Sequence, residues 1–226
     1  MTELWLFLQS PAGNAATNMA VDEALLRDAA ERRLPLLRVY TWVRPAVSFG
    51  YFQEFPAGLA AKYEIIRRPT GGGVVYHGDD TTYTVIVPPV HPLYDMKTTD
   101  AYCAIHKAVA VACEQSTDKR SGGSPTLQTT PSASPRGQYE CFQKPVSGDV
   151  VAEGRKLAGA AQRRTKHGML HQGSIAANIT ADQLQAGFRT TLQAEFCPYA
   201  LCAVECALVE KLVREKYASE AWNRRI

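Results

Sequence analysis

Short runs of β-branched and aromatic residues recur along this chain in groups, and this order of segments restricts its fold class. The strand-type runs are residues 3–8, 36–42, 46–52, 64–68, 82–87, 149–152, 155–158 and 169–175. Apolar residues at helical spacing predict helices over residues 14–33, 98–115, 181–188 and 204–217. Because the strands come in runs, with helices at either end and in the middle, we predict an α+β fold with a mixed, largely antiparallel sheet flanked by helices.

Composition places the chain among ordinary globular proteins, since 46% of its 226 residues are hydrophobic and 21% are charged. A net charge of +3, with Lys and Arg spread along the sequence, does not indicate nucleic acid binding. No window approaches the roughly 18 apolar residues of a membrane span, and the N-terminus lacks an export signal. We therefore expect a cytoplasmic protein with no membrane partner.

Residues 116–137 differ in composition from the rest of the chain. They are dominated by Ser, Thr, Pro and Gly, with almost no large apolar side chains. Such a stretch is typical of a mobile insertion rather than of a second packed domain. We therefore expect one domain over residues 1–226 that carries this insertion.

The six cysteines do not form a C-x-x-C pair, so neither a metal site nor a redox pair is predicted. Four of them are expected to be inert buried hydrophobes: Cys103, Cys113, Cys202 and Cys206. Cys141 differs because it follows the loop-like stretch and lies within plausible reach of Lys156, whose charge would raise the thiolate fraction. Context alone leaves a buried and a catalytic Cys141 both open.

The densest group of chemically special residues is RRPTGGGVVYH at 67–77. Three glycines in a row lack Cβ atoms, so a ligand can lie directly against the main chain, although a bare triple glycine can also be a flexible turn. The spacing fits neither a phosphate-binding P-loop nor a dinucleotide fingerprint. Arg67 and Arg68 are adjacent on a predicted strand and point to opposite faces, so only one of them can enter a pocket. His77 has two possible roles that stay open here, a structural one and a catalytic one.

A second group, GRKLAGAAQRR at 154–164, places Lys156 beside the small residues Ala158, Gly159, Ala160 and Ala161. Small side chains leave room for a ligand, or they allow a strand to pack closely on a helix. Close packing accounts for the alanines equally well, but it does not explain the lysine.

Several motifs together resemble the lipoate-protein ligase and octanoyltransferase family, whose catalytic domain is similar to that of biotin-protein ligases. The matching segments are residues 18–25, 37–42, 45–53, 67–73 with His77, 149–151, 154–164 and 171–174. The resemblance implies an acyl-binding loop and a lysine-bearing hairpin. The site residues it implies are Arg68, Thr70, Gly71, Gly72, Gly73, His77, Lys156, Ala158 and Gly159.

The family has two chemistries. Ligases activate free lipoate with ATP and Mg, and many need an accessory domain after the catalytic one. Octanoyltransferases take the acyl group from a carrier-protein thioester through a cysteine, without a nucleotide or other cofactor. Here the motifs end at residue 174, which leaves too short a tail for a full accessory domain, and Cys141-Phe142 resembles the position of the nucleophile in one transferase branch. Cys197 is the competing nucleophile, because another branch places its cysteine beyond the hairpin.

The resemblance therefore implies an octanoyltransferase in protein lipoylation, with Cys141 as nucleophile and Lys156 as its support. The expected partners are octanoyl-acyl carrier protein as donor and a lipoyl domain or glycine-cleavage carrier protein as acceptor, with the enzyme a monomer. Two alternatives stay open: an ATP-dependent lipoate-protein ligase, and a non-catalytic acyl-binding accessory protein.

Overall fold

A computed structural model describes residues 2–116, 124–129 and 145–225. An eight-stranded sheet forms its centre, in the strand order β11-β1-β2-β6-β10-β9-β8-β7. Its strands are β1 (Glu3–Gln9), β2 (Leu36–Tyr40), β6 (Thr81–Val87), β7 (Thr126–Leu127), β8 (Val150–Ala152), β9 (Arg155–Thr165), β10 (Gly168–Ile175) and β11 (Ala194–Pro198). The β11–β1 and β1–β2 pairs are parallel, and the remaining pairs are antiparallel. The predicted mixed, largely antiparallel α+β fold is confirmed.

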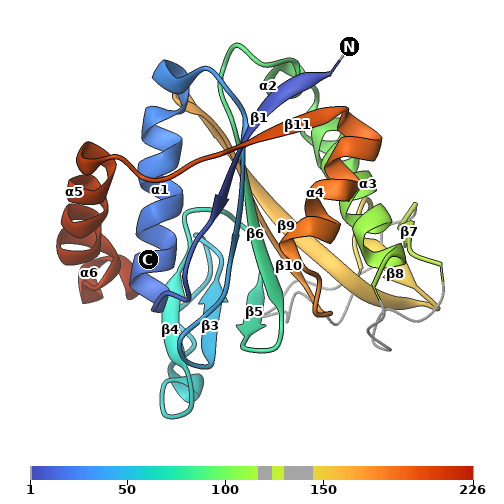
Figure 1. The fold of residues 1–226 in the computed structure, drawn as a ribbon. Helices are drawn as coiled ribbons and strands as arrows, with labels where there is room; N and C mark the ends of the chain where they lie inside the picture. Colours follow the sequence, from blue (N-terminus) through green and yellow to red (C-terminus); the bar gives the residue numbers. More distant parts are fainter. Residues whose placement is uncertain (1, 117–123, 130–144, 226) are drawn as a thin grey trace.

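A second, three-stranded sheet lies below the large one in Figure 1. Its order is β4-β3-β5, formed by β3 (Ala46–Phe49), β4 (Glu64–Arg67) and β5 (Val74–His77). A short 3₁₀ turn, η1 (Ala57–Leu59), lies between β3 and β4. The runs 36–42 and 46–52 therefore enter different sheets instead of pairing across the turn at Arg44-Pro45.

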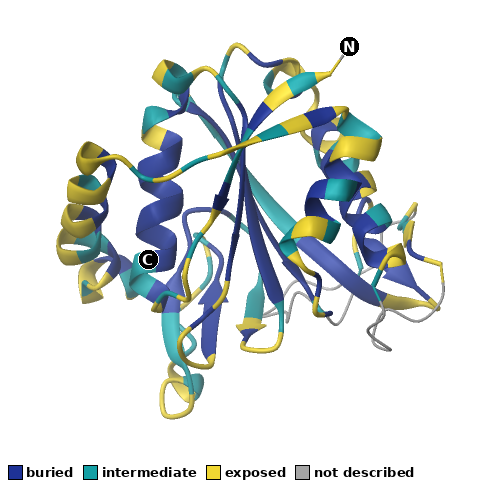
Figure 2. Cartoon of the chain, in the orientation of Figure 1, coloured by how far each residue is buried: buried dark blue, intermediate teal, exposed yellow. Residues whose placement is uncertain are grey.

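Helices cover both faces of the large sheet (Figure 1). One face carries α1 (Ala15–Arg32), with α5 (Ala203–Leu212), the π-helical η3 (Val213–Tyr217) and α6 (Glu220–Asn223) outside it. The other face carries α3 (Thr98–Glu114) and α4 (Ala181–Leu192), and the short α2 (Pro92–Asp95) leads into α3. Each face buries its own apolar cluster, and Figure 2 shows α1 dark along most of its length because α5 covers it.

Several sequence expectations differ from the structure. β5 and β11 were not predicted, and β9 extends to Thr165, well beyond the predicted run. Within the Ser/Pro/Gly-rich stretch, Thr126–Leu127 pairs with β8, whereas residues 117–123 and 130–137 lie outside the described residues. Cys113 is buried as expected, and Cys103 is half-buried, but Cys202, the N-cap of α5, and Cys206, within α5, are exposed. No helix among the described ranges is long and apolar enough to span a membrane.

A buried arginine joins the small sheet to the last helix of the described chain. The Arg67 side chain is 1% exposed and donates hydrogen bonds to main-chain carbonyls of two segments that are distant in sequence. These acceptors are Tyr51 and Gln53, at 2.7 Å each, and Trp222, Asn223 and Arg225, at 2.6 to 3.1 Å. The guanidinium thus satisfies carbonyls at the end of α6, which have no partner inside the helix.

Replacing Arg67 with Met is expected to lower the free energy of unfolding by about 3 kcal/mol, because several buried carbonyls would lose a charged donor. Urea denaturation followed by circular dichroism measures this change. Arg224→Met is the matched control, since the Arg224 side chain is 54% exposed, and it should shift stability by no more than about 0.5 kcal/mol. An equal loss in the two variants would contradict the anchoring role of Arg67.

Candidate active site

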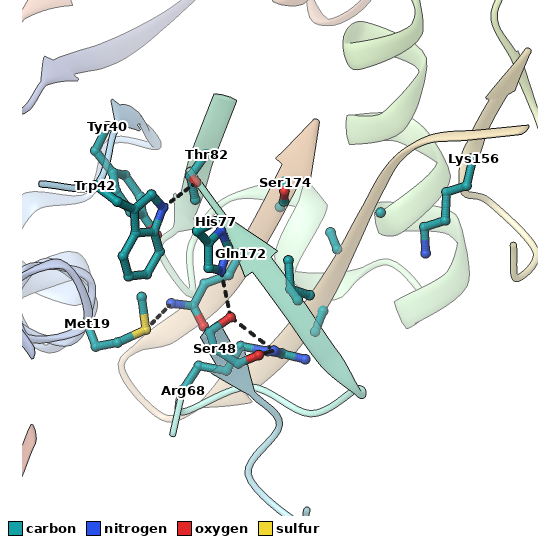
Figure 3. A pocket seen from close by; sticks show the side chains of 15 residues that line it. Met19, Tyr40, Trp42, Ser48, Arg68, His77, Thr82, Lys156, Gln172 and Ser174 are labelled. Carbon is teal, nitrogen blue, oxygen red and sulfur yellow. Dashed lines mark hydrogen bonds between the residues drawn. The ribbon is translucent and has the colours of Figure 1, made fainter. Parts of the chain in front are cut away.

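A pocket opens between the small sheet and the middle of the large one, where β5, β9 and β10 approach each other. It encloses about 470 Å³, counting its open mouth. Much of its wall is apolar or small, and these lining residues include Met19, Tyr40, Trp42, Val75, Ala160 and Ala161. Figure 3 shows the Lys156 amine across the pocket from the cluster of Trp42 and His77. The pocket thus has an apolar part and, at Lys156, a charged part. A narrow apolar chain that ends in a polar reacting group would fit both parts.

The pocket end opposite Lys156 is held rigidly by stacking and hydrogen bonds. The Trp42 and His77 rings stack with centroids 4.1 Å apart, and Trp42 Nε1 donates to Thr82 Oγ1 at 2.8 Å. His77 bridges Ser48 through Nε2 and Asp80 through Nδ1, both at 2.8 Å. Both ring nitrogens of His77 are thus committed to neighbouring side chains. These contacts favour a structural role for His77.

Arg68 points into the pocket region and holds the glycine loop through the loop's carbonyls. Its Nη2 donates to the Gly71 and Gly73 oxygens at 2.7 and 2.8 Å, and Nη1 donates to the Ser48 oxygen at 3.1 Å. Arg67 lies on the other side of β4, so the predicted separation of the two arginines is confirmed. Gly50 lets the loop approach closely, since a Cβ built there would fall 1.9 Å from the Gly72 oxygen.

Thr70 connects this loop to a buried polar cluster under α1. Thr70 Oγ1 donates to Gln172 Oε1 at 2.7 Å, and Gln172 Nε2 donates to Asp22 Oδ2 at 2.7 Å. The same Asp22 carboxylate accepts from Arg38 Nη1 at 2.6 Å and from Thr84 Oγ1 at 2.9 Å. Asp22 and Arg38 are fully buried, so the pair satisfies both charges inside the protein.

Lys156 supplies a positive charge at the hairpin side of the pocket, in addition to Arg68 at the glycine loop. Its amine lies 2.8 Å from Asp149 Oδ2, and the two side chains are 5% and 0% exposed. The hairpin of β8 and β9 reverses the chain direction. Asp149, directly before β8, therefore lies beside Lys156, the second residue of β9. Gly159 makes room for the lysine, because a Cβ at that position would lie 2.3 Å from Lys156 Cε and 2.4 Å from Nζ. The small residue noticed in the sequence therefore accommodates the lysine itself.

Two buried histidines lie behind this pair. His106 Nδ1 is 2.7 Å from the Gly148 oxygen and therefore carries the hydrogen, and His171 contacts Tyr83 and Gln162 through its two nitrogens. Burial lowers the pKa of His106 to about 4, against a smaller opposing effect of Asp149. Burial, followed by repulsion from His106, lowers the pKa of His171 well below its ordinary value. Both imidazoles are neutral at neutral pH.

The sequence-predicted site residues separate into four groups. Arg68, His77, Lys156 and Gly159 line the pocket. Thr70 and the loop Gly71–Gly73 stand beside it through the hydrogen bonds above, whereas Ala158 does not line the pocket and is buried in the apolar cluster on the α3 face. Cys141 lies outside the described residues. The competing Cys197 is exposed on β11, at the far edge of the large sheet from the β8–β9 hairpin.

Sequence reasoning did not assign a role to four residues that shape the site: Ser48, Asp149, Tyr102 and Gln172. Asp149 carried a detectable signal, since it begins the hairpin that presents Lys156 and a buried lysine requires a carboxylate. Tyr102 had none, and Gln172 was noted only as part of the matching segment 171–174, because the roles of both depend on contacts between elements distant in sequence.

Stability is expected to fall as pH drops from 7 to 5. Below about pH 6.5 the unfolded imidazoles bind protons, whereas the folded His106 does not until about pH 4, so the unfolded state gains protons first. His106 should contribute a loss of about 2 kcal/mol over this interval, and His171 a further loss in the same direction. Urea unfolding at the two pH values measures the loss, and His106→Gln should remove about 2 kcal/mol of it. A pH dependence that is unchanged in His106→Gln would contradict this account.

Comparisons with known proteins identify the family and the fold of the chain. Residues 14–215 match the family model described as the lipoyl protein ligase A/B catalytic domain. Octanoyltransferase LipM of Bacillus anthracis is 30% identical over 98% of each chain, and that of Macrococcus caseolyticus is 35% identical over 81% of this chain and 70% of its own. A crystal structure of lipoate-protein ligase A bound with ATP superposes with a TM-score of 0.76 at 24% identity, over 99% of each chain.

These matches bear on the expectations drawn from the sequence motifs. The solved structure confirms the predicted fold type, and the curated relatives confirm the predicted enzyme class, an acyltransferase. The family model covers the glycine loop, the lysine hairpin and the helices α1, α3 and α4 that cover the large sheet. The chain belongs to the lipoyl protein ligase A/B catalytic domain family.

Proposed function

We propose that the protein is an octanoyltransferase of protein lipoylation. It takes an octanoyl group from the thioester of an acyl carrier protein and transfers it to a lysine of a lipoyl domain or a glycine-cleavage carrier protein. Relatives named octanoyltransferase, similar over almost their whole length, support the substrate class. The structural observation that supports it most is the buried Lys156–Asp149 pair facing an apolar pocket.

The proposed nucleophile is Cys141. Val146 N donates to Asp149 Oδ2 at 2.7 Å, so the chain that leads from Cys141 ends beside the Lys156–Asp149 pair. Val146 follows Cys141 by five positions, and an extended segment of that length spans at most about 17 Å. Chain connectivity therefore allows the thiolate to reach the lysine amine. A lysine ammonium directly beside the sulfur would favour the thiolate over the thiol.

The reaction consists of two acyl transfers. In the first, the Cys141 thiolate attacks the octanoyl carbonyl, the bond to the carrier sulfur breaks and the carrier thiolate leaves. In the second, the neutral acceptor lysine amine attacks the new thioester, the bond to the Cys141 sulfur breaks and Cys141 leaves as a thiolate, while the attacking nitrogen gives up one proton to water as the amide forms. Neither transfer consumes a nucleotide, because the thioester supplies the driving force. The acceptor amine must first lose a proton, which costs about 4 to 5 kcal/mol at pH 7.

Lys156 is proposed to stabilise the oxygen that becomes anionic in both steps. An ammonium held by a buried carboxylate is already oriented when the substrate arrives, and a donor of this kind contributes about 3 to 4 kcal/mol in other acyl-transfer enzymes. The octanoyl chain would extend from there along Ala160 and Ala161 toward Met19 and Trp42, where each buried methylene contributes about 0.8 kcal/mol. One chain supplies every group named, so we propose a monomeric catalytic domain that acts in the cytoplasm without a cofactor.

Incubation with octanoyl-acyl carrier protein in the absence of ATP should add one octanoyl group to Cys141, detectable by mass spectrometry of the intact protein and its peptides. Cys141→Ser should show no thioester adduct, whereas Cys197→Ser should react as the unaltered protein does. Absence of the adduct, together with lipoylation that requires ATP and free lipoate, would identify a ligase instead. Binding of octanoate with neither activity would indicate an accessory protein.

Gly159→Ala should lower the octanoyl transfer rate by about a hundredfold, because the new methyl group would occupy the space of the Lys156 amine. Steady-state transfer to a lipoyl domain measures this effect. Gly58→Ala is the matched control, since a Cβ there meets nothing within 4 Å, and its rate should not change. A Gly159→Ala enzyme of full activity would remove Lys156 from the mechanism.

A further inference from the structure

We infer that Tyr102, on α3, is a positioning residue for acyl transfer: its hydroxyl fixes the Asp149 carboxylate, and Asp149 in turn fixes the Lys156 amine. The inference rests on the proposed function. Tyr102 is not among the residues that line the pocket in the described part of the chain, so it acts through Asp149 rather than on the substrate.

Asp149 is the point where three segments meet. Its Oδ1 accepts from Tyr102 Oη at 2.6 Å, and its Oδ2 accepts from Val146 N at 2.7 Å and from Lys156 Nζ at 2.8 Å. The two Oδ2 donors lie on the turn and the hairpin that carry Asp149 itself. Tyr102 is the donor that comes from a separate element, and it ties the carboxylate to α3. A carboxylate held at both oxygens keeps one orientation.

The direction of the tyrosine hydrogen bond follows from its other partner. Ala160 N donates to Tyr102 Oη at 2.9 Å, which occupies an acceptor position of the hydroxyl. The single hydroxyl hydrogen then points to the carboxylate at 2.6 Å in preference to the Ala160 oxygen at 3.3 Å. Burial, reinforced by the Asp149 charge, raises the pKa of Tyr102 well above its ordinary value, so the hydrogen stays on the hydroxyl.

α3 also holds the turn that precedes Asp149. His106 Nδ1 donates to the Gly148 oxygen at 2.7 Å, one helical turn along α3 from Tyr102. Gly148 has a φ of 89°, and a Cβ there would lie 2.7 Å from Tyr102 Cδ1, so the turn packs directly on the tyrosine ring. Two side chains of one helix therefore set both the main chain and the side chain of this turn.

The consequence concerns the catalytic step rather than acyl binding. Without the hydroxyl, Asp149 Oδ1 loses its donor, the carboxylate can rotate, and the lysine amine is no longer held at one place beside Gly159. Tyr102→Phe should therefore lower kcat for octanoyl transfer by about tenfold and leave KM for the acyl donor unchanged. A purely structural role would lower stability without this division between kcat and KM.

The decisive experiment is a double-mutant cycle of Tyr102→Phe and Asp149→Asn with two readouts. One is kcat for octanoyl transfer. The other is the rate at which acetic anhydride modifies Lys156, measured by peptide mass spectrometry, which needs no enzymatic activity. Tyr102→Phe should raise the labelling rate by about fivefold in the unaltered protein and by less than about twofold in the Asp149→Asn background. Additive effects in the two backgrounds would overturn the inference.

Tyr94→Phe is the matched control, because it removes a hydroxyl that donates to the Thr165 oxygen at 3.0 Å, away from the pocket lining. It should change neither readout. If Asp149→Asn does not fold, the contrast between Tyr102→Phe and Tyr94→Phe decides alone, and equal labelling in the two overturns the inference. If the unaltered enzyme transfers no octanoyl group, the proposed function fails, while the labelling rates still test whether Tyr102 fixes Lys156.

Discussion

A lysine ammonium buried beside an apolar pocket is stable only if a carboxylate and further donors accompany it, and the surroundings of Lys156 follow from this requirement. Asp149 supplies the opposite charge from within the same hairpin. Gly159 leaves the space that the amine occupies, and α3 supplies the donor for the second carboxylate oxygen. The cost of burying two charges is thus offset by contacts from two strands, a turn and a helix.

The glycine loop on the other side of the pocket has its own support. Arg68 holds its carbonyls from within, and Arg67, one residue earlier, ties the same strand to the C-terminal helix. Alternation along a strand sends the two guanidinium groups to opposite faces. A loop of three glycines has little conformational preference of its own, so its shape depends on these fixed donors. The pocket is therefore preformed without a bound acyl chain.

The fold class was predictable because the spacing of apolar residues in long segments such as 14–33 and 169–175 indicates a helix or a strand directly. β5 and β11 were not predicted, each for its own reason. The run 74–77 reads as the end of a glycine loop, and Ala194–Pro198 is short and half-exposed, stabilised by parallel pairing with β1. The loop and lysine motifs were visible as clusters of unusual residues. The roles of Tyr102 and Gln172 were not, since the role of a tyrosine on a helix or a glutamine on a strand becomes clear only when its partner is known.

The cluster under α1 also has a consequence for how this sequence can change over time. Asp22 joins Arg38, Thr84 and Gln172, and Gln172 reaches Thr70 of the glycine loop. Loss of any one member leaves a buried polar group unsatisfied, so a single replacement is selected against even where a coordinated set would be neutral. These positions should therefore covary among homologues. We expect each lineage to keep one complete set of cluster residues, because intermediate sets with one member replaced are less stable.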